Sequence, residues 1–128
     1  MKLLLDTHSF LWFIGGHSSL SQHARTLIED MANQRFMSVA SLWEMAIKLS
    51  LGKLTLAQPF ELLIPEQMKT NSIELLAIEL DHLASVTKLP FHHRDPFDRL
   101  LIAQALVEQM SVISADGAFD AYPIQRLW

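Results

Sequence analysis

Four acidic residues stand at points of this sequence where a small domain has no packing use for a charge: Asp6, Glu44, Asp98 and Asp116. A lone carboxylate in apolar surroundings is costly to desolvate unless a cation compensates it. Carboxylate oxygens suit Mg²⁺ or Mn²⁺, and thiolate ligands are excluded because the chain has no cysteine. We therefore expect these four side chains to converge on a divalent metal site.

The elements that must position these acids alternate between short apolar strands and helices. Strands are expected at residues 2–6, 35–37, 72–76 and 112–114, and helices at residues 8–14, 21–31, 39–51, 59–69, 79–86 and 95–110. This alternation predicts one α/β domain over residues 1–128, with a central parallel sheet of four to five short strands flanked by helices on both faces.

Composition narrows the classes of protein that the chain can represent. Its 128 residues fit one domain, and half of them are apolar. The mean hydropathy of +0.20 is high for so small a domain, so we expect part of the apolar surface to meet another chain. No apolar run approaches the roughly 18 residues of a membrane span, and we expect a cytoplasmic protein. The net charge of −4 argues against gripping nucleic acid by bulk positive charge, although bound divalent ions would offset it locally.

Asp6 and Asp116 each come at or just past the carboxyl end of a buried strand. Ligands of open α/β sheets collect at that edge, so the two acids are expected to share it. The alternative for each is a turn or helix-capping role, because aspartate readily accepts from nearby backbone N–H groups. The neighbouring hydroxyls of Thr7 and Ser114 could orient the acids or a water, or serve as cap and turn hydroxyls themselves.

Glu44 lies in a helix that is apolar on nearly every side, as a buried helix is. One narrow polar stripe runs along this helix, formed by Ser41, Glu44 and Lys48. The stripe must therefore face solvent or a hydrated cavity. An exposed ion pair between Glu44 and Lys48 is the alternative interpretation, and it accounts for the pair without explaining why the stripe is isolated.

Asp95 precedes Pro96, which suits the first position of a helix, so Asp95 is expected to cap that helix and Asp98 to lie in its first turn. Asp98 is therefore the better metal ligand, and Asp95 is either an accessory ligand or only a cap. The flanking Arg94 and Arg99 are candidates for contacts with substrate phosphates, although scattered basic residues are usually only solvated.

Four segments together resemble the PIN-domain family of metal-dependent ribonucleases, and within it the VapC-like toxins. They are LLLDTHSFLW at residues 3–12, SVASLWEMAIKLSLGKL at 38–54, HHRDPFDRLLIAQA at 92–105 and ISADGAFDAY at 113–122. The resemblance covers essentially the whole chain. It implies that the four acids of the family correspond to Asp6, Glu44, Asp98 and Asp116, and no position departs from the acidic pattern.

The resemblance also implies a function. Proteins of this kind are endoribonucleases that need Mg²⁺ or Mn²⁺ and cleave RNA phosphodiester bonds by a metal-activated water. Each is the toxin of a toxin–antitoxin pair, a homodimer inhibited by a small antitoxin from an adjacent gene. Whether one ion or two act, and which RNA is cut, stays open at this level.

Two other classes of α/β protein that use an aspartate near the first strand are excluded, because this sequence lacks residues that they require. A haloacid-dehalogenase-like phosphatase needs a second aspartate two residues after Asp6, where His8 stands. A response-regulator receiver needs a phosphoacceptor aspartate after the third strand, where residues 76–78 are Leu, Ala and Ile. A catalytically inactive PIN-like module that binds a protein partner remains the alternative, and an intact acidic quartet speaks against it because a pure binder gains nothing by clustering like charges.

Overall fold

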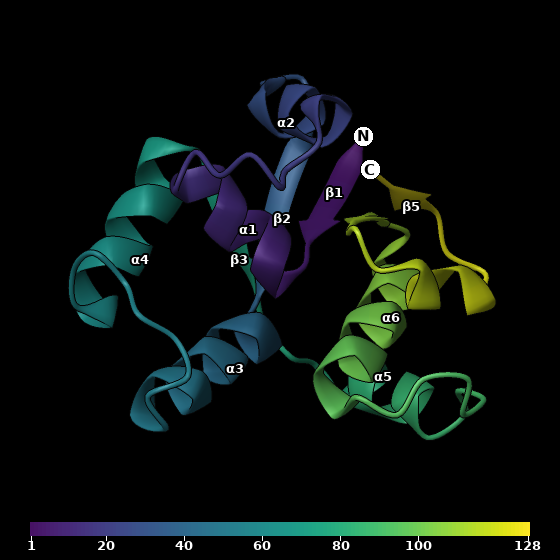
Figure 1. The fold of residues 1–128 in the computed structure, drawn as a ribbon. Helices are drawn as coiled ribbons and strands as arrows, with labels where there is room; N and C mark the ends of the chain where they lie inside the picture. The colour runs from purple at the N-terminus through teal and green to yellow at the C-terminus, as the bar shows by residue number, and fades with distance from the viewer.

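A computed structural model describes residues 1–128 and contains a central sheet, six α-helices and one short 3₁₀ helix (Figure 1). The elements in chain order are β1 (Lys2–Leu5), α1 (Thr7–Ile14), α2 (Gln22–Glu29), β2 (Gln34–Ser38), α3 (Val39–Ser50), α4 (Phe60–Thr70), β3 (Ile73–Leu76), α5 (Leu80–Val86), α6 (Pro96–Glu108), β4 (Ser111–Ile113), η1 (Gly117–Ala121) and β5 (Arg126–Leu127). The predicted α/β class and single domain are confirmed.

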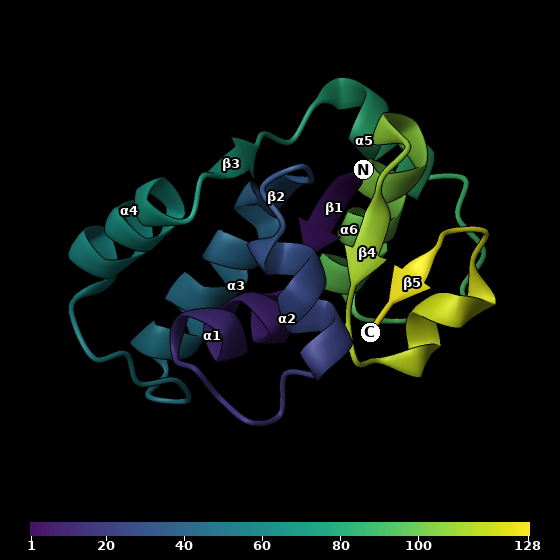
Figure 2. The same ribbon diagram turned by 90° about the horizontal axis from the view of Figure 1, so that it is seen from above.

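All five strands are parallel and lie in the order β3-β2-β1-β4-β5, as Figure 2 shows. Leu3 of β1 is paired with Arg35 of β2 on one side and with Ser111 of β4 on the other. The chain therefore runs outward from β1 to β2 and β3, then returns to the other side of β1. Such a reversal opens a crevice at the carboxyl ends of the strands, which is where open α/β sheets bind ligands.

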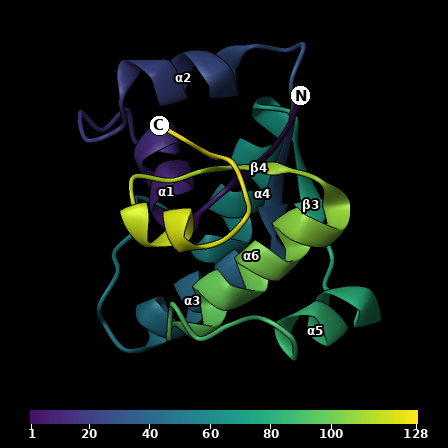
Figure 3. The same ribbon diagram turned by 90° about the vertical axis from the view of Figure 1, so that its right-hand side faces the viewer.

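Alternating side chains of β1 supply both layers of the core. Leu3 and Leu5 pack with residues of α1, α2, α3 and α4 on one face of the sheet, and Leu4 packs with residues of α6 and η1 on the other. Figure 3 shows α2 and α5 at opposite ends of the molecule with the sheet between them. Because all three leucines are fully buried, β1 is held in place from both sides, and the residue that follows it inherits that rigidity.

The sequence prediction missed two elements near the end of the chain, η1 and β5. A two-residue strand carries no periodicity of its own, and β5 exists because its backbone pairs with β4. The expected helices and the four expected strands are present, with ends that differ by one or two residues. No helix is both long enough and apolar enough to cross a membrane.

Candidate functional site

The four acids expected to converge line one pocket of about 250 Å³ at the carboxyl edge of the sheet. They reach it from the β1–α1 junction, α3, the first turn of α6 and the segment after β4. No apolar residue lines this pocket, which we call the acidic pocket. Its full lining is Asp6, Thr7, His8, Glu44, Lys48, His93, Asp95, Asp98 and Asp116.

Asp6 and Thr7 connect β1 to the pocket. One oxygen of Asp6, Oδ1, accepts from the Ser9 N–H at 2.9 Å and caps α1, so the expected capping role is present. The residue is 8% exposed and still lines the pocket. The Thr7 hydroxyl donates to Glu44 Oε1 at 2.6 Å, which fixes the Glu44 carboxylate against the start of α1.

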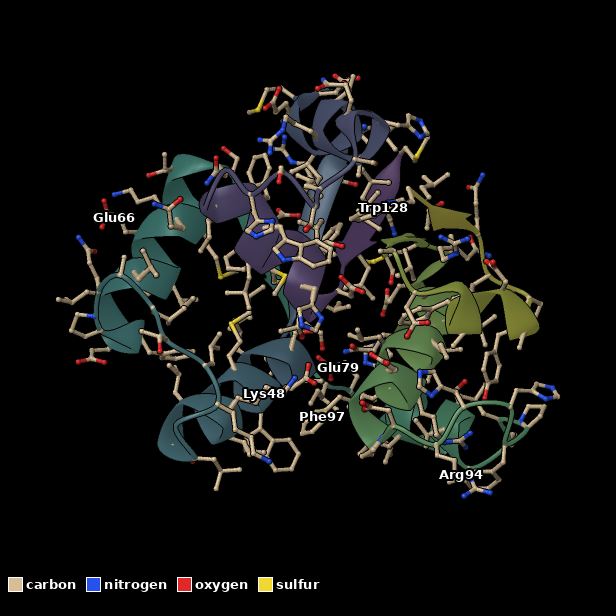
Figure 4. All side chains as sticks on the ribbon, in the orientation of Figure 1. Lys48, Glu66, Glu79, Arg94, Phe97 and Trp128 are labelled. Carbon is tan, nitrogen blue, oxygen red and sulfur yellow. The ribbon has the colours of Figure 1, made fainter.

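Glu44 satisfies both interpretations of its polar stripe. Its Oε2 lies 3.2 Å from Lys48 Nζ, so the ion pair one helical turn away exists. Both residues also line the acidic pocket, while Ser41 at the other end of the stripe is buried. Figure 4 shows the Lys48 side chain on α3. The pair therefore belongs to the pocket wall and is not an isolated surface contact.

Asp95 caps α6 as predicted, because its Oδ1 accepts from the N–H groups of Phe97 at 2.8 Å and Asp98 at 3.2 Å. Pro96 at the start of the helix has no N–H to satisfy. This cap sets the first turn of α6 so that the Asp98 side chain reaches the pocket. The Asp95 carboxylate also lines the pocket, so capping and accessory roles are both compatible with its position.

Asp116 is held by a turn that begins at the end of β4. The buried Ser114 hydroxyl accepts from the Asp116 N–H at 3.0 Å, and Asp116 Oδ1 accepts from the Ala118 N–H at 2.9 Å. The Arg126 guanidinium donates to the Ser114 carbonyl at 3.1 Å and ties this turn to β5. Ser114 is thus a turn hydroxyl that places Asp116, which is the most exposed of the four acids.

His93 also belongs to the site, although the sequence analysis gave it no role. Its Nε2 lies 2.9 Å from Asp98 Oδ2 and 4.0 Å from Asp116 Oδ2. Its backbone N–H donates to the Tyr122 hydroxyl at 2.9 Å, which holds the loop over the pocket. The position of this loop depends on a hydroxyl 29 positions away, so spacing along the sequence gave no signal for the contact.

Negative charge is in excess in the acidic pocket, which five carboxylates line with Lys48 as the fixed cation. The pKa of Asp98 is raised to about 6, most strongly by burial and next by the charge of Asp95; His93 opposes the rise, and Asp6 and Glu44 add to it. Carboxylate oxygens held together with too little positive charge are the donor set that a hard divalent cation prefers. The residues present therefore fit Mg²⁺ or Mn²⁺.

The two arginine candidates are not brought to the pocket. Arg94 is exposed, and Figure 4 shows it at the outer edge of the molecule. Arg99 is 5% exposed, packs on the Phe91 ring at 4.0 Å and donates to main-chain carbonyls, so the expected contact with substrate phosphate is wrong. The acceptors of its terminal nitrogens are the carbonyls of Val86, Leu89, Pro90 and His93 and the Tyr122 hydroxyl.

Comparisons with solved structures agree with this architecture. The chain superimposes with a TM-score of 0.67 on a chain of VapBC2 from Rickettsia felis bound to a promoter DNA fragment, at 15% identity over 99% of this chain and 98% of that one. It superimposes with a TM-score of 0.64 on chains of a toxin–antitoxin complex from Klebsiella pneumoniae and of FitAcB from Neisseria gonorrhoeae, each at 15% identity over 98% of this chain and 96% of the other. At this identity the likeness establishes the fold.

Sequence comparison identifies the family. Ribonuclease VapC16 from Mycobacterium tuberculosis is 33% identical over 60 residues, which are 47% of this chain and 43% of that protein. The match thus spans less than half the length of that relative. The model of the PIN domain matches residues 3–125, which are almost the whole chain and include the four predicted metal ligands. This chain belongs to the PIN domain family.

Proposed function

We propose that this protein is a metal-dependent endoribonuclease of the VapC kind, in which Asp6, Glu44, Asp98 and Asp116 hold Mg²⁺ or Mn²⁺. One observation carries the proposal: four carboxylates that are distant in sequence line a single pocket without apolar neighbours. The partial similarity to a ribonuclease supports the same activity. An inactive binding module is the weaker alternative, because it has no use for the repulsion among these acids.

A bound Mg²⁺ or Mn²⁺ would lower the pKa of a water and offset the charge that develops on the phosphoryl oxygens. The chain's own residues set the positions of the ligands. Thr7 orients Glu44 by donating to Oε1, while Lys48 holds the other oxygen. His93 contacts Asp98, and Ser114 fixes the backbone of Asp116. Such supporting contacts are what keeps metal ligands in one geometry.

Asp95 also affects the four proposed ligands through its charge. Its charge is the second cause of the raised pKa of Asp98, so it adds negative potential next to a ligand without leaving its capping position. We therefore assign Asp95, Thr7 and Ser114 accessory roles that position the four ligands. The proposed cleavage needs no side-chain nucleophile, because water would supply the attacking oxygen.

The proposed biological role is that of a cytoplasmic toxin silenced by a small antitoxin. The similar solved structures include toxin–antitoxin complexes. An apolar pocket of about 210 Å³ between α1 and the segment before α4 offers a site for the apolar side chains of such a partner. Large exposed apolar residues, among them Trp43 at 60% and Phe91 at 81%, also favour the expected homodimer.

The activity is tested by cleavage of structured and single-stranded RNA with Mg²⁺, with Mn²⁺ and with chelator. Asp6→Asn keeps the size of the side chain but removes a ligand charge, so cleavage is expected to fall by about tenfold to a hundredfold while the fold survives. Glu44→Gln and Asp98→Asn should behave alike. Asp81→Asn, an exposed aspartate of α5 outside the pocket, is the matched control and should cleave normally. Full metal-dependent activity of Asp6→Asn would overturn the assignment.

The toxin role needs a separate experiment. The chain is expressed alone and together with the small gene next to it, and growth, complex formation and the size of the purified protein are measured. Growth arrest relieved by the neighbour, and a dimer in solution, are expected. A harmless monomer that no neighbouring product binds would overturn the toxin role even where nuclease activity remains.

A further inference from the structure

A second groove of about 420 Å³ adjoins the acidic pocket, and the charged side chains that line it are lysines. It is lined by two lysines, two histidines and a tryptophan among other residues, and by no carboxylate. The two cavities share Thr7, His8 and Lys48 in their walls, so they lie side by side. We call this the basic groove and define it by His8, Trp12, His17, Lys48 and Lys53.

Three rings of the basic groove form an ordered aromatic surface on α1 and the loop after it. The centroid of Trp12 lies 5.5 Å from that of His8 and 6.0 Å from that of His17, with the His17 ring nearly parallel at 24°. The His17 ring is fixed because its Nδ1 accepts from the Ser19 N–H at 3.0 Å. Both histidines are exposed, and Trp12 is half-buried against the core.

The lysines of the basic groove are placed by the end of α3. Gly52 has a φ of +70°, and the N–H groups of Gly52 and Lys53 donate to the carbonyls of Leu49 and Lys48 at 3.1 and 2.8 Å. This is a Schellman motif, which needs a left-handed residue at Gly52. It returns Lys53 toward Lys48. Lys53 is exposed and forms no ion pair, so its charge is available to a ligand.

We propose that the basic groove binds a single-stranded stretch of RNA beside the scissile phosphate, with an unpaired base on the His8, Trp12 and His17 rings and a backbone phosphate at Lys53. The inference rests on the proposed nuclease function. Positive charge alternating with aromatic faces is how proteins hold single strands without reading their sequence. In a duplex the faces of the bases are stacked inside the helix, so this groove selects unpaired segments.

Charge decides between RNA and a protein segment as the occupant. The basic groove adjoins a pocket of five carboxylates, where a polyanion needs neighbouring cations to offset the overall charge of −4. The apolar pocket lined by Leu11, Leu54 and Leu63 is the better seat for an amphipathic protein helix.

The test measures binding separately from cleavage by using Asp6→Asn as the parent. Anisotropy of a fluorescent single-stranded RNA of mixed sequence, and of the same sequence as a blunt duplex, gives both affinities over a range of salt. Added to that parent, His17→Ala and Lys53→Ala should each weaken single-strand binding about fivefold to tenfold. Lys53→Ala should also lower the slope of log affinity against log salt by about 0.7. Lys88→Ala, exposed and outside both cavities, is the matched control and should bind as its parent does.

The outcomes separate the two proposals. Unchanged single-strand binding by both groove variants, or equally tight binding of duplex, overturns the groove assignment even where the wild-type protein cleaves RNA. Weakened binding by the groove variants together with no cleavage by the wild type overturns the nuclease and keeps the groove. Loss of antitoxin binding with normal RNA binding by the groove variants assigns the groove to the protein partner and overturns the proposal.

Discussion

Asp98 and Arg99 are consecutive in α6 and face two regions that treat a buried charge in opposite ways. Arg99 lies under the loop between α5 and α6, where both of its terminal nitrogens donate to main-chain carbonyls and its plane covers the Phe91 ring. Asp98 lies in the acidic pocket, where burial and, after it, neighbouring charges raise its pKa to about 6. A charge neutralised by fixed backbone dipoles supports the fold, whereas a charge left in excess is ready for a ligand.

The largest effect on stability is expected on the side of Arg99. Arg99→Met removes the donor of one buried carbonyl and of three partly buried ones. A buried carbonyl left without a donor costs about 1–3 kcal/mol, so we expect a total loss of about 3 kcal/mol. Chemical denaturation measures it. Arg94→Met, five residues earlier and exposed, is the control and should change stability by less than about 0.5 kcal/mol. Equal effects of the two variants would contradict the structural role of Arg99.

Substitution of the neighbouring Asp98 should stabilise the fold, whereas substitution of Arg99 should destabilise it. The pKa of Asp98 is raised from 3.8 to about 6, so the folded state holds this proton more tightly than the unfolded state does. The unfolding free energy of the cation-free protein therefore falls as pH rises from about 4 to 6. Since one pKa unit corresponds to about 1.4 kcal/mol, Asp98→Asn should be more stable than the parent by about 1–3 kcal/mol at pH 7.

Thermal unfolding in chelator at pH 3 and pH 7 checks this, because the difference should vanish at the lower pH. Addition of Mg²⁺ should raise the melting temperature of the parent and leave Asp98→Asn nearly unchanged. A variant less stable than the parent at pH 7 in chelator would show that the acidic pocket is not strained by its charges.

A smaller effect is expected at Asp95, which contributes both a cap and a charge. Asp95→Ala removes the acceptor for two N–H groups at the start of α6 and should cost about 1 kcal/mol. Asp95→Asn keeps the cap and removes one cause of the raised pKa of Asp98. Denaturation of both variants separates the two contributions, and equal losses would mean that the cap is not what Asp95 supplies.

The smallest effect is expected at Asp120, on the surface next to the acidic pocket. A hydrogen bond from the Arg126 guanidinium, at 2.8 Å, lowers the pKa of Asp120 below its ordinary value of 3.8. The pair therefore stabilises the fold at pH above that value, and the contribution is lost as pH falls through the lowered pKa. Asp120→Asn should be slightly less stable at pH 7 and equal to the parent in strong acid. A pH-independent difference would exclude the ion pair as its cause.

The sequence was informative wherever a residue's environment follows from its own segment. Asp6 follows an apolar strand, Glu44 interrupts an apolar helix, and Asp95 precedes a proline, so the sheet edge, the polar stripe and the cap could each be predicted. The meeting of these segments required only that parallel strands share one carboxyl edge. The roles of the acids as metal ligands remain predictions.

What could not be predicted depends on contacts between distant segments. Arginine is usually an exposed residue, so the sequence suggested that Arg99 is exposed. Arg99 is buried because the carbonyls of the loop after α5 point toward α6 and accept from its guanidinium. His93 contacts Asp98 through the same loop, whose position is set partly by the Tyr122 hydroxyl. Neither contact has a local pattern, so neither could be found from spacing.

Because β1 pairs with both β2 and β4, the acidic pocket can form only when distant parts of the chain have met. The Ser9 hydroxyl donates to the carbonyl of Ile113, which lies 104 positions away, and the same junction carries Asp6 and Asp116. Closing so long a stretch of chain is slow, and it completes only when the sheet is assembled. A partly folded chain thus holds its acids apart and lacks the acidic pocket. The proposed activity therefore requires the complete sheet, and detachment of β4 would remove Asp116 from the pocket.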